Sequence, residues 1–146
     1  MGDCEFNCTE EDRQLLIECT SKGVKTFKVQ YMSRVAKCVK VYDGDTATFA
    51  MRLSPGLPIM KWSCRFAHID TAEIRSKDEE MKREAMKTRD YVAGLILDQI
   101  VRLRFIKHGK YRPVVEVYLE DGTYLNQLLL DEGYAKPYSG SGPKPY

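Results

Sequence analysis

The residues best suited to chemistry are acids placed beside turns. Asp43 and Asp45 flank Gly44 in the run Tyr-Asp-Gly-Asp-Thr, and Asp70 follows an apolar segment. If that segment is a strand paired with the hairpin around Gly44, these carboxylates meet at one rim of a sheet. Neighbouring carboxylates repel one another and resist sharing a site. A hard cation relieves this repulsion, and carboxylate and carbonyl oxygens are ligands that suit calcium.

Two arginines accompany these acids. Arg65 precedes Asp70 within the same segment, and Arg112 stands before Pro113, which favours an extended backbone at the start of a strand. A guanidinium is permanently charged and grips a phosphate with two parallel hydrogen bonds. A cation, two arginines and a further carboxylate are the parts needed for phosphodiester hydrolysis, because they stabilise charge on phosphorus and orient or deprotonate water.

Alternating apolar residues predict the strands that position these groups. Asp-Gly pairs predict turns, since they accept a positive φ at little cost. The first pair lies at Asp43-Gly44 and the second at Asp121-Gly122. The expected strands cover residues 35–42, 46–53, 62–69, 101–105 and 115–119. In the third of these, His68 is expected to be a packed strand residue, and Arg65 faces away from the apolar side chains.

Three helices are expected between and around the strands. Thr9 and the acids after it predict a short helix over residues 10–19. Ser76 with Glu79 forms a second capping box, which predicts a longer helix starting there. The expected buried stripe of this longer helix is Met81, Ala85, Val92, Leu95 and Ile96. The last helix covers residues 125–132, with Gly133 beyond its end.

This element order predicts an α+β protein with a five-stranded OB-fold-like β-barrel. A helix lies between strands three and four, a short helix follows strand five, and one extra helix precedes the barrel. Barrels of this kind bind oligonucleotides on one exposed face. We expect an N-terminal extension over residues 1–30, the barrel domain over 31–138, and a flexible Gly-, Ser- and Pro-rich tail over 139–146.

Composition narrows the function classes. The 146 residues fit one domain, and no apolar run approaches the ~20 residues that a membrane span needs. The acidic first residues lack the basic and then apolar pattern of a secretory signal, so we expect an intracellular protein or a mature form after processing. The five cysteines have no repeated spacing and suggest free thiols. Cys4 and Cys8 have no second pair to complete a zinc site.

The motifs YDGDT, RFAHIDTAE, KYR and LLLDEGYAK resemble those of the staphylococcal nuclease (thermonuclease) family in order and spacing. The resemblance extends over residues 35–138. It implies an OB-like barrel and a calcium-dependent nuclease that cleaves DNA and RNA to leave 3′-phosphate ends. We expect single-stranded substrates to be preferred.

The resemblance also implies a role for each site residue. Asp45, Asp70 and the carbonyl of Thr71 are the expected calcium ligands, with Asp43 as a supporting acid beside the metal. Glu73 matches the family's general base. The two phosphate-gripping arginines are Arg65 and Arg112.

The sequence departs from the family at two positions. Ala72 stands where the family usually has proline, which loosens the turn that carries Glu73. Tyr111 stands where the family usually has glycine before the second arginine, and its ring offers a surface for a base to stack on. Lys110, Tyr111 and Tyr138 are the candidate substrate-binding residues.

Each motif also has a plainer interpretation. Asp43-Gly44-Asp45 is also what an ordinary hairpin turn looks like, and Asp121-Gly122-Thr123 has the same form without the second acid. Glu73 and Arg65 are also consistent with solvated surface charges. Two rival functions follow: a non-catalytic nuclease-like domain that binds nucleic acid or protein, and a plain single-strand binder of OB type. The joint occurrence of Asp45, Glu73 and Arg112 favours the enzyme.

Overall fold

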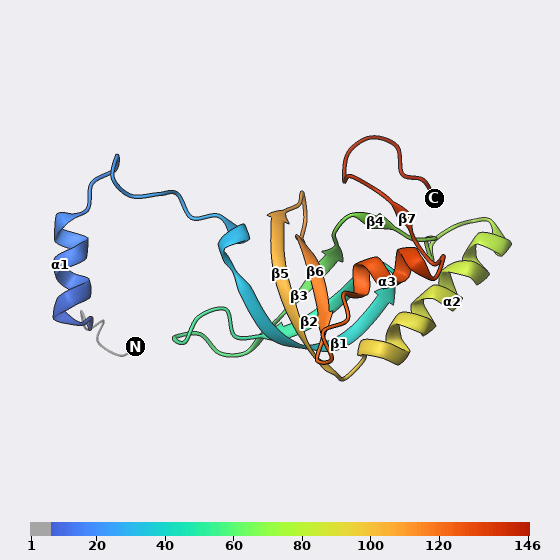
Figure 1. The fold of residues 1–146 in the computed structure, drawn as a ribbon, viewed down its shortest axis with the longest axis horizontal. Helices are drawn as coiled ribbons and strands as arrows, with labels where there is room; N and C mark the ends of the chain where they lie inside the picture. The colour runs from blue at the N-terminus through green and yellow to red at the C-terminus, as the bar shows by residue number, and fades with distance from the viewer. Residues whose placement is uncertain (1–6) are drawn as a thin grey trace.

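A closed barrel of five strands forms the centre of the molecule in the computed structural model, which describes residues 7–146 (Figure 1). Around the barrel the strands follow the order β1-β2-β3-β6-β5, with β1 also paired to β5. Only β3 and β6 pair in parallel among these strands. The strands are β1 (Ser33–Asp43), β2 (Thr46–Met51), β3 (Met60–Phe66), β5 (Ile100–His108) and β6 (Pro113–Leu119). The predicted α+β, OB-fold-like barrel is therefore confirmed.

The alternating apolar residues fill the barrel. In β5, Val101, Leu103 and Phe105 are buried while Arg102 and Arg104 face solvent. Successive strand side chains point to opposite faces, so this alternation places one set in the core and the other in water. Phe49 and Phe66 are likewise fully buried, with ring centroids 6.4 Å apart.

The long helix α2 (Glu79–Ile96) covers one side of the barrel and packs against β1. Its predicted start at Ser76 is wrong, because Asp78 is the N-cap and its side chain accepts from the Glu80 amide. Ser76 instead accepts from the amide of Asp78 through its hydroxyl. In the predicted stripe Ala85, Val92 and Ile96 are buried, Met81 and Leu95 are partly exposed, and Thr88 is a buried member that the sequence did not indicate.

The predicted third strand is wrong at its end, because β3 stops at Phe66. The Ala67 amide donates to the carbonyl of Val115, and His68 then takes a φ of 70° that turns the chain out of the barrel. The short strand β4 (Ile69–Asp70) pairs with β7 (Lys136–Pro137) in a separate two-stranded sheet. His68 is thus a turn residue with its side chain 57% exposed, and its predicted packed position is incorrect.

The remaining elements lie at the ends of the chain. The helix α1 (Glu10–Glu18) is capped by Thr9, as predicted, and has no buried residue; Figure 1 shows it apart from the barrel. A single 3-10 turn, η1 (Val29–Tyr31), precedes β1, and α3 (Leu125–Asp131) packs on β6. Cys8, Cys19, Cys38 and Cys64 are free, while Cys4 and the first part of the predicted extension lie outside the described residues. Within residues 7–146 no helix has the length and apolar character to span a membrane.

Candidate active site

The turn between β1 and β2 brings the first two acids together. Asp43 pairs with Thr46, which leaves Gly44 and Asp45 at the tip. Gly44 has no positive φ here, contrary to the sequence-based reason for its presence. The lack of room for a side chain explains the glycine instead. A Cβ at this position would lie 2.4 Å from the Thr88 Cγ2 atom and 3.0 Å from the Thr71 side chain. The turn is thus pressed between α2 and the segment after β4.

The carboxylates of this turn are buried and hydrogen-bonded. Asp43 is 8% exposed and Asp45 is 4% exposed. Asp43 Oδ1 accepts the Asp45 amide at 3.3 Å, and Asp45 Oδ1 accepts the Thr46 hydroxyl at 3.0 Å. Asp45 Oδ2 accepts the Thr71 amide at 3.2 Å, which links the turn to the end of β4. The predicted meeting of the hairpin acids with the end of the third segment is therefore present.

Burial and repulsion from a neighbouring carboxylate raise the pKa values of Asp43 and Asp70. Burial raises the pKa of Asp43 to about 7, and the Asp45 carboxylate adds to this rise. Burial also raises the pKa of Asp70, and repulsion from Asp45 contributes; hydrogen bonds from the Tyr146 amide and Arg65 only partly oppose it. Burial and repulsion between carboxylates both disfavour the ionised acids, and a bound cation relieves both effects.

Arg65, at the end of β3, bridges two of the acids. Its Nη2 atom lies 3.4 Å from Asp45 Oδ2 and 3.2 Å from Asp70 Oδ1. The strand register places Arg65 opposite Thr46, which sets the guanidinium beside the turn. Its Cζ atom also lies 5.8 Å from the ring centroid of Tyr138. Two acids and an aromatic face thus fix the orientation of this guanidinium.

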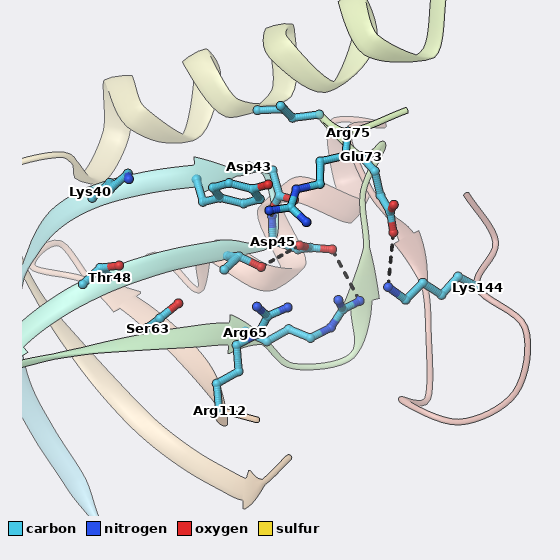
Figure 2. A pocket seen from close by; sticks show the side chains of 13 residues that line it. Lys40, Asp43, Asp45, Thr48, Ser63, Arg65, Glu73, Arg75, Arg112 and Lys144 are labelled. Atoms are coloured by element: carbon cyan, nitrogen blue, oxygen red, sulfur yellow. Dashed lines mark hydrogen bonds and ion pairs between the residues drawn. The ribbon is translucent and has the colours of Figure 1, made fainter. Parts of the chain in front are cut away.

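A cleft of about 460 Å³ opens over these groups. Figure 2 shows the side chains of Arg65, Arg112 and Glu73 in it, together with the hairpin acids. Glu73 lies on the connection between β4 and α2, and its Oε1 atom is 3.2 Å from Lys144 Nζ. Arg112 immediately precedes β6. Residues from four separate parts of the chain therefore meet in one cavity, as the sequence predicts for Asp43, Asp45, Arg65, Glu73 and Arg112.

The candidate substrate-binding residues divide into two groups. Lys110 and Tyr138 line a neighbouring cavity of about 350 Å³, which shares Arg65 and Lys144 with the cleft. Tyr111 is 83% exposed and lines neither cavity, although Lys110 Nζ lies 5.3 Å from its ring centroid. The structure thus brings two of the three toward the site and leaves Tyr111 outside it.

Three cations of the cleft were not assigned to the site from the sequence. They are Lys40 on β1, Arg75 before α2, and Lys144 near the end of the chain. Arg75 Cζ lies 6.0 Å from the ring centroid of Tyr42, which also lines the cleft. Lys40 stands three residues before Asp43, after a register shift in β1 that breaks the alternation set by Ala36 and Cys38, so strand periodicity did not indicate its exposed position. Nothing local to Lys144 indicates that it reaches the cleft.

The oxygen atoms of the site fit a hard cation. Among residues 7–146 no three His, Cys, Asp or Glu side chains form a preassembled metal centre. Asp45 and Asp70 nevertheless direct oxygens at one shared atom, Arg65 Nη2, so their carboxylates converge. Beside them the hydroxyl of Thr71 is buried without a hydrogen-bond partner. Two convergent carboxylates and an unsatisfied oxygen of Thr71 form a donor set that suits calcium better than zinc.

Comparison with known proteins adds no assignment of its own. The sequence matches neither a protein-family model nor a curated protein.

Proposed function

We propose that this chain is a calcium-dependent nuclease that hydrolyses phosphodiester bonds of DNA or RNA, leaving 3′-phosphate ends. One observation carries the proposal: a single cleft of the OB-like barrel is lined by the buried acids Asp43 and Asp45, by Glu73, and by Arg65 and Arg112, and Arg65 also pairs with the buried Asp70. A plain single-strand binder accounts for the cations of this cleft but not for buried acids with raised pKa values.

The arginines hold and stabilise the phosphate. The cleft is lined by five cationic side chains, which are Lys40, Arg65, Arg75, Arg112 and Lys144. Such a surface suits a polyanion. Arg65 is oriented by its two carboxylate contacts, and a preorganised donor stabilises developing charge without the cost of reorganising. Arg112 supplies a second fork from the position just before β6, the strand that pairs with β3.

Glu73 is the residue proposed to orient or deprotonate the attacking water. Its side chain is 51% exposed, so water reaches it freely. It is separated from Asp70 by two residues, which keeps it beside the acidic end of the cleft. A general base must lie within reach of the proton that it removes, and the presence of Glu73 in the same cleft as Arg65 and Arg112 supports this role.

Asp45, Asp70 and Thr71 are the residues that would hold calcium. When bound, the ion supplies Lewis acidity and neutralises charge on the phosphoryl oxygens. Asp43 helps to position Asp45, because the Asp43 carboxylate accepts a hydrogen bond from the Asp45 amide.

Exchange of Glu73 for glutamine separates an enzyme from a binder. Glu73→Gln should retain single-stranded oligonucleotide binding within a few fold but lower kcat on the order of 10²-fold, the usual scale of a lost general base. Glu120→Gln changes an exposed acid outside the cleft and serves as the control, with wild-type turnover. Binding would be measured in chelator and hydrolysis of labelled DNA and RNA in calcium.

Two outcomes contradict parts of the proposal. If wild type and Glu73→Gln both bind nucleic acid and neither cleaves it, the chain is a non-catalytic binder. If both cleave equally well, another group activates the water.

A further inference from the structure

The segment 139–146 loops back after β7 (Figure 1), and its Lys144 side chain reaches Glu73 at one side of the cleft (Figure 2). Lys144 Nζ lies 3.2 Å from Glu73 Oε1, and the amide of Tyr146 donates to Asp70 Oδ2 at 3.1 Å. Lys144 lines both the cleft and the neighbouring cavity. The two acids that this segment contacts are those assigned above to water activation and to calcium.

The conformation of the segment is specified by its own residues. Gly140 and Gly142 have φ values of 91° and 78°, a region that residues with a Cβ rarely occupy. The Tyr138 hydroxyl donates to the carbonyl of Gly142 at 3.0 Å and closes the turn. The composition that predicts a flexible tail thus also permits this reversal, and the mobility of the segment stays a prediction.

The far end of the segment is held by Tyr146. Its ring centroid lies 4.2 Å from Lys136 Nζ, and its hydroxyl donates to Glu84 Oε1 at 3.4 Å. These contacts join the segment to β7 and α2, the elements on either side of Asp70 and Glu73. The segment therefore has anchors on both sides of the acids that it contacts.

We propose that residues 139–146 are an autoinhibitory strap, which occupies Glu73 and Asp70 until a nucleic-acid phosphate backbone displaces it. The proposal rests on the function proposed above for the same site. Lys144 neutralises the carboxylate that must act on water, and the Tyr146 amide uses an oxygen of a calcium ligand. Substrate and strap therefore compete for one surface.

The strength of the contacts suits a displaceable element. Lys144 and Glu73 have side chains that are 41% and 51% exposed, and exposed ion pairs contribute little to stability. A phosphate backbone held by Arg65 and Arg112 competes with the strap for this surface, because charge-assisted bonds to phosphate are strong. The strap can thus open without disturbing the barrel core.

Two variants of the 146-residue chain release the strap by different means. Lys144→Met removes the ion pair, and Gly142→Val strains the turn without changing any charge. Lys25→Met, in the exposed segment after α1, is the control for loss of a lysine. Each would be measured for single-stranded DNA affinity in chelator by fluorescence anisotropy, and for amide hydrogen exchange at residues 139–146.

We expect both release variants to bind DNA about 2- to 5-fold more tightly, the scale of an exposed ion pair. Exchange at the Tyr146 amide should accelerate in both, and the Lys25→Met variant should match wild type in both measurements. In a Glu73→Gln background the ion pair is already broken, so Lys144→Met should give no further gain. Weaker binding by Lys144→Met with unchanged exchange would overturn the strap and make Lys144 a substrate contact.

Failure of the strap and failure of the nuclease proposal have different signatures. Tighter binding and faster exchange without hydrolysis by any variant would retain the strap as a gate over a binding site. Hydrolysis in calcium, with Gly142→Val and wild type equal in affinity and exchange, would retain the nuclease and reject the strap.

Discussion

The two Asp-Gly turns of this chain have the same dipeptide and opposite environments. At Asp43-Gly44 the carboxylate is 8% exposed, its pKa is raised to about 7, and a Cβ on the glycine would collide with Thr88 and Thr71. At Asp121-Gly122 the carboxylate is exposed, and hydrogen bonds within the turn to Thr123 lower its pKa. Gly122 has a φ of 91° with nothing near its Cβ position.

This difference distinguishes a turn whose buried acid lies in the candidate site from a turn that only reverses the chain. The second turn is relaxed: its acid accepts the Thr123 amide at 2.9 Å and the glycine serves the backbone. The first turn holds its acid where burial and Asp45 both disfavour the charge. Groups kept in unfavourable electrostatic surroundings are often found at functional sites. The dipeptide is therefore uninformative alone, and its surroundings carry the functional signal.

The largest expected effect is a loss of kcat when an arginine of the cleft is exchanged for lysine. Arg65→Lys and Arg112→Lys should each lower kcat on the order of 10²-fold, because a point charge replaces a preorganised fork. Arg104→Lys is the matched control, since Arg104 pairs with Glu116 outside the cleft. Steady-state hydrolysis of a labelled oligonucleotide measures all three. Near-normal kcat in Arg112→Lys would show that this residue is only part of the connection before β6.

The pH dependence of stability should have opposite sign for the two turn acids. Because the folded pKa of Asp43 is raised from 3.8 to about 7, its contribution to stability is fully present below about pH 4 and is lost as the pH rises to about 7. The loss amounts to at most ~4 kcal/mol, at about 1.36 kcal/mol for each unit. Asp121 has a lowered pKa, so its contribution is present above its unfolded value and is lost as the pH falls.

Urea unfolding in chelator between pH 4 and pH 8 measures the contribution of Asp43, while the loss expected for Asp121 falls below this range. Asp43→Asn should flatten the decline toward high pH, and Asp121→Asn should leave it intact. An equal decline in wild type and Asp43→Asn would remove Asp43 as its source.

The smallest expected effects are losses of stability when the glycine of either turn is exchanged for alanine. Gly44→Ala should destabilise the fold by about 1–3 kcal/mol, the usual cost of overpacking. Gly122→Ala should cost about 1–2 kcal/mol through left-handed backbone strain. Thr88→Ser removes the methyl group that the new Cβ meets at 2.4 Å, so it should rescue Gly44→Ala and not Gly122→Ala. Equal effects of Thr88→Ser on both variants, in thermal unfolding, would contradict the packing explanation.

The barrel was predictable because apolar and polar residues alternate clearly in strands such as β5. Leu103 and Phe105 alternate with arginines, and the period of two fixes which face is buried. The end of β3 was not predictable, because hydrogen bonds from distant residues decide it: Ala67 donates to Val115, and its carbonyl accepts from Asn126. The start of α2 was ambiguous, since Ser76 and Asp78 are both good caps and local sequence does not rank them.

The residues of the candidate site likewise fall into a group that the sequence predicts and a group that it does not. Asp45, Arg65 and Arg112 sit at strand ends, where turn chemistry and strand order bring them together. Gly44 was read correctly as a turn residue for the wrong reason, because its contact with Thr88 depends on how α2 packs. Lys144 and Tyr146 were missed as members of the site, since a Gly- and Pro-rich segment carries no periodic pattern that shows where it lies.

Calcium-dependent hydrolysis by the two turn variants tests the central claim most directly. Labelled single-stranded DNA and RNA would be incubated with wild type, Asp45→Ala and Asp121→Ala, each in calcium and in chelator. Wild type and Asp121→Ala should cleave in calcium to give 3′-phosphate ends and should be inactive in chelator. Asp45→Ala should lose at least about 10²-fold in rate while remaining folded, because it removes a calcium ligand and a partner of Arg65. Absence of hydrolysis by wild type in calcium, or equal rates for all three proteins, would contradict the account.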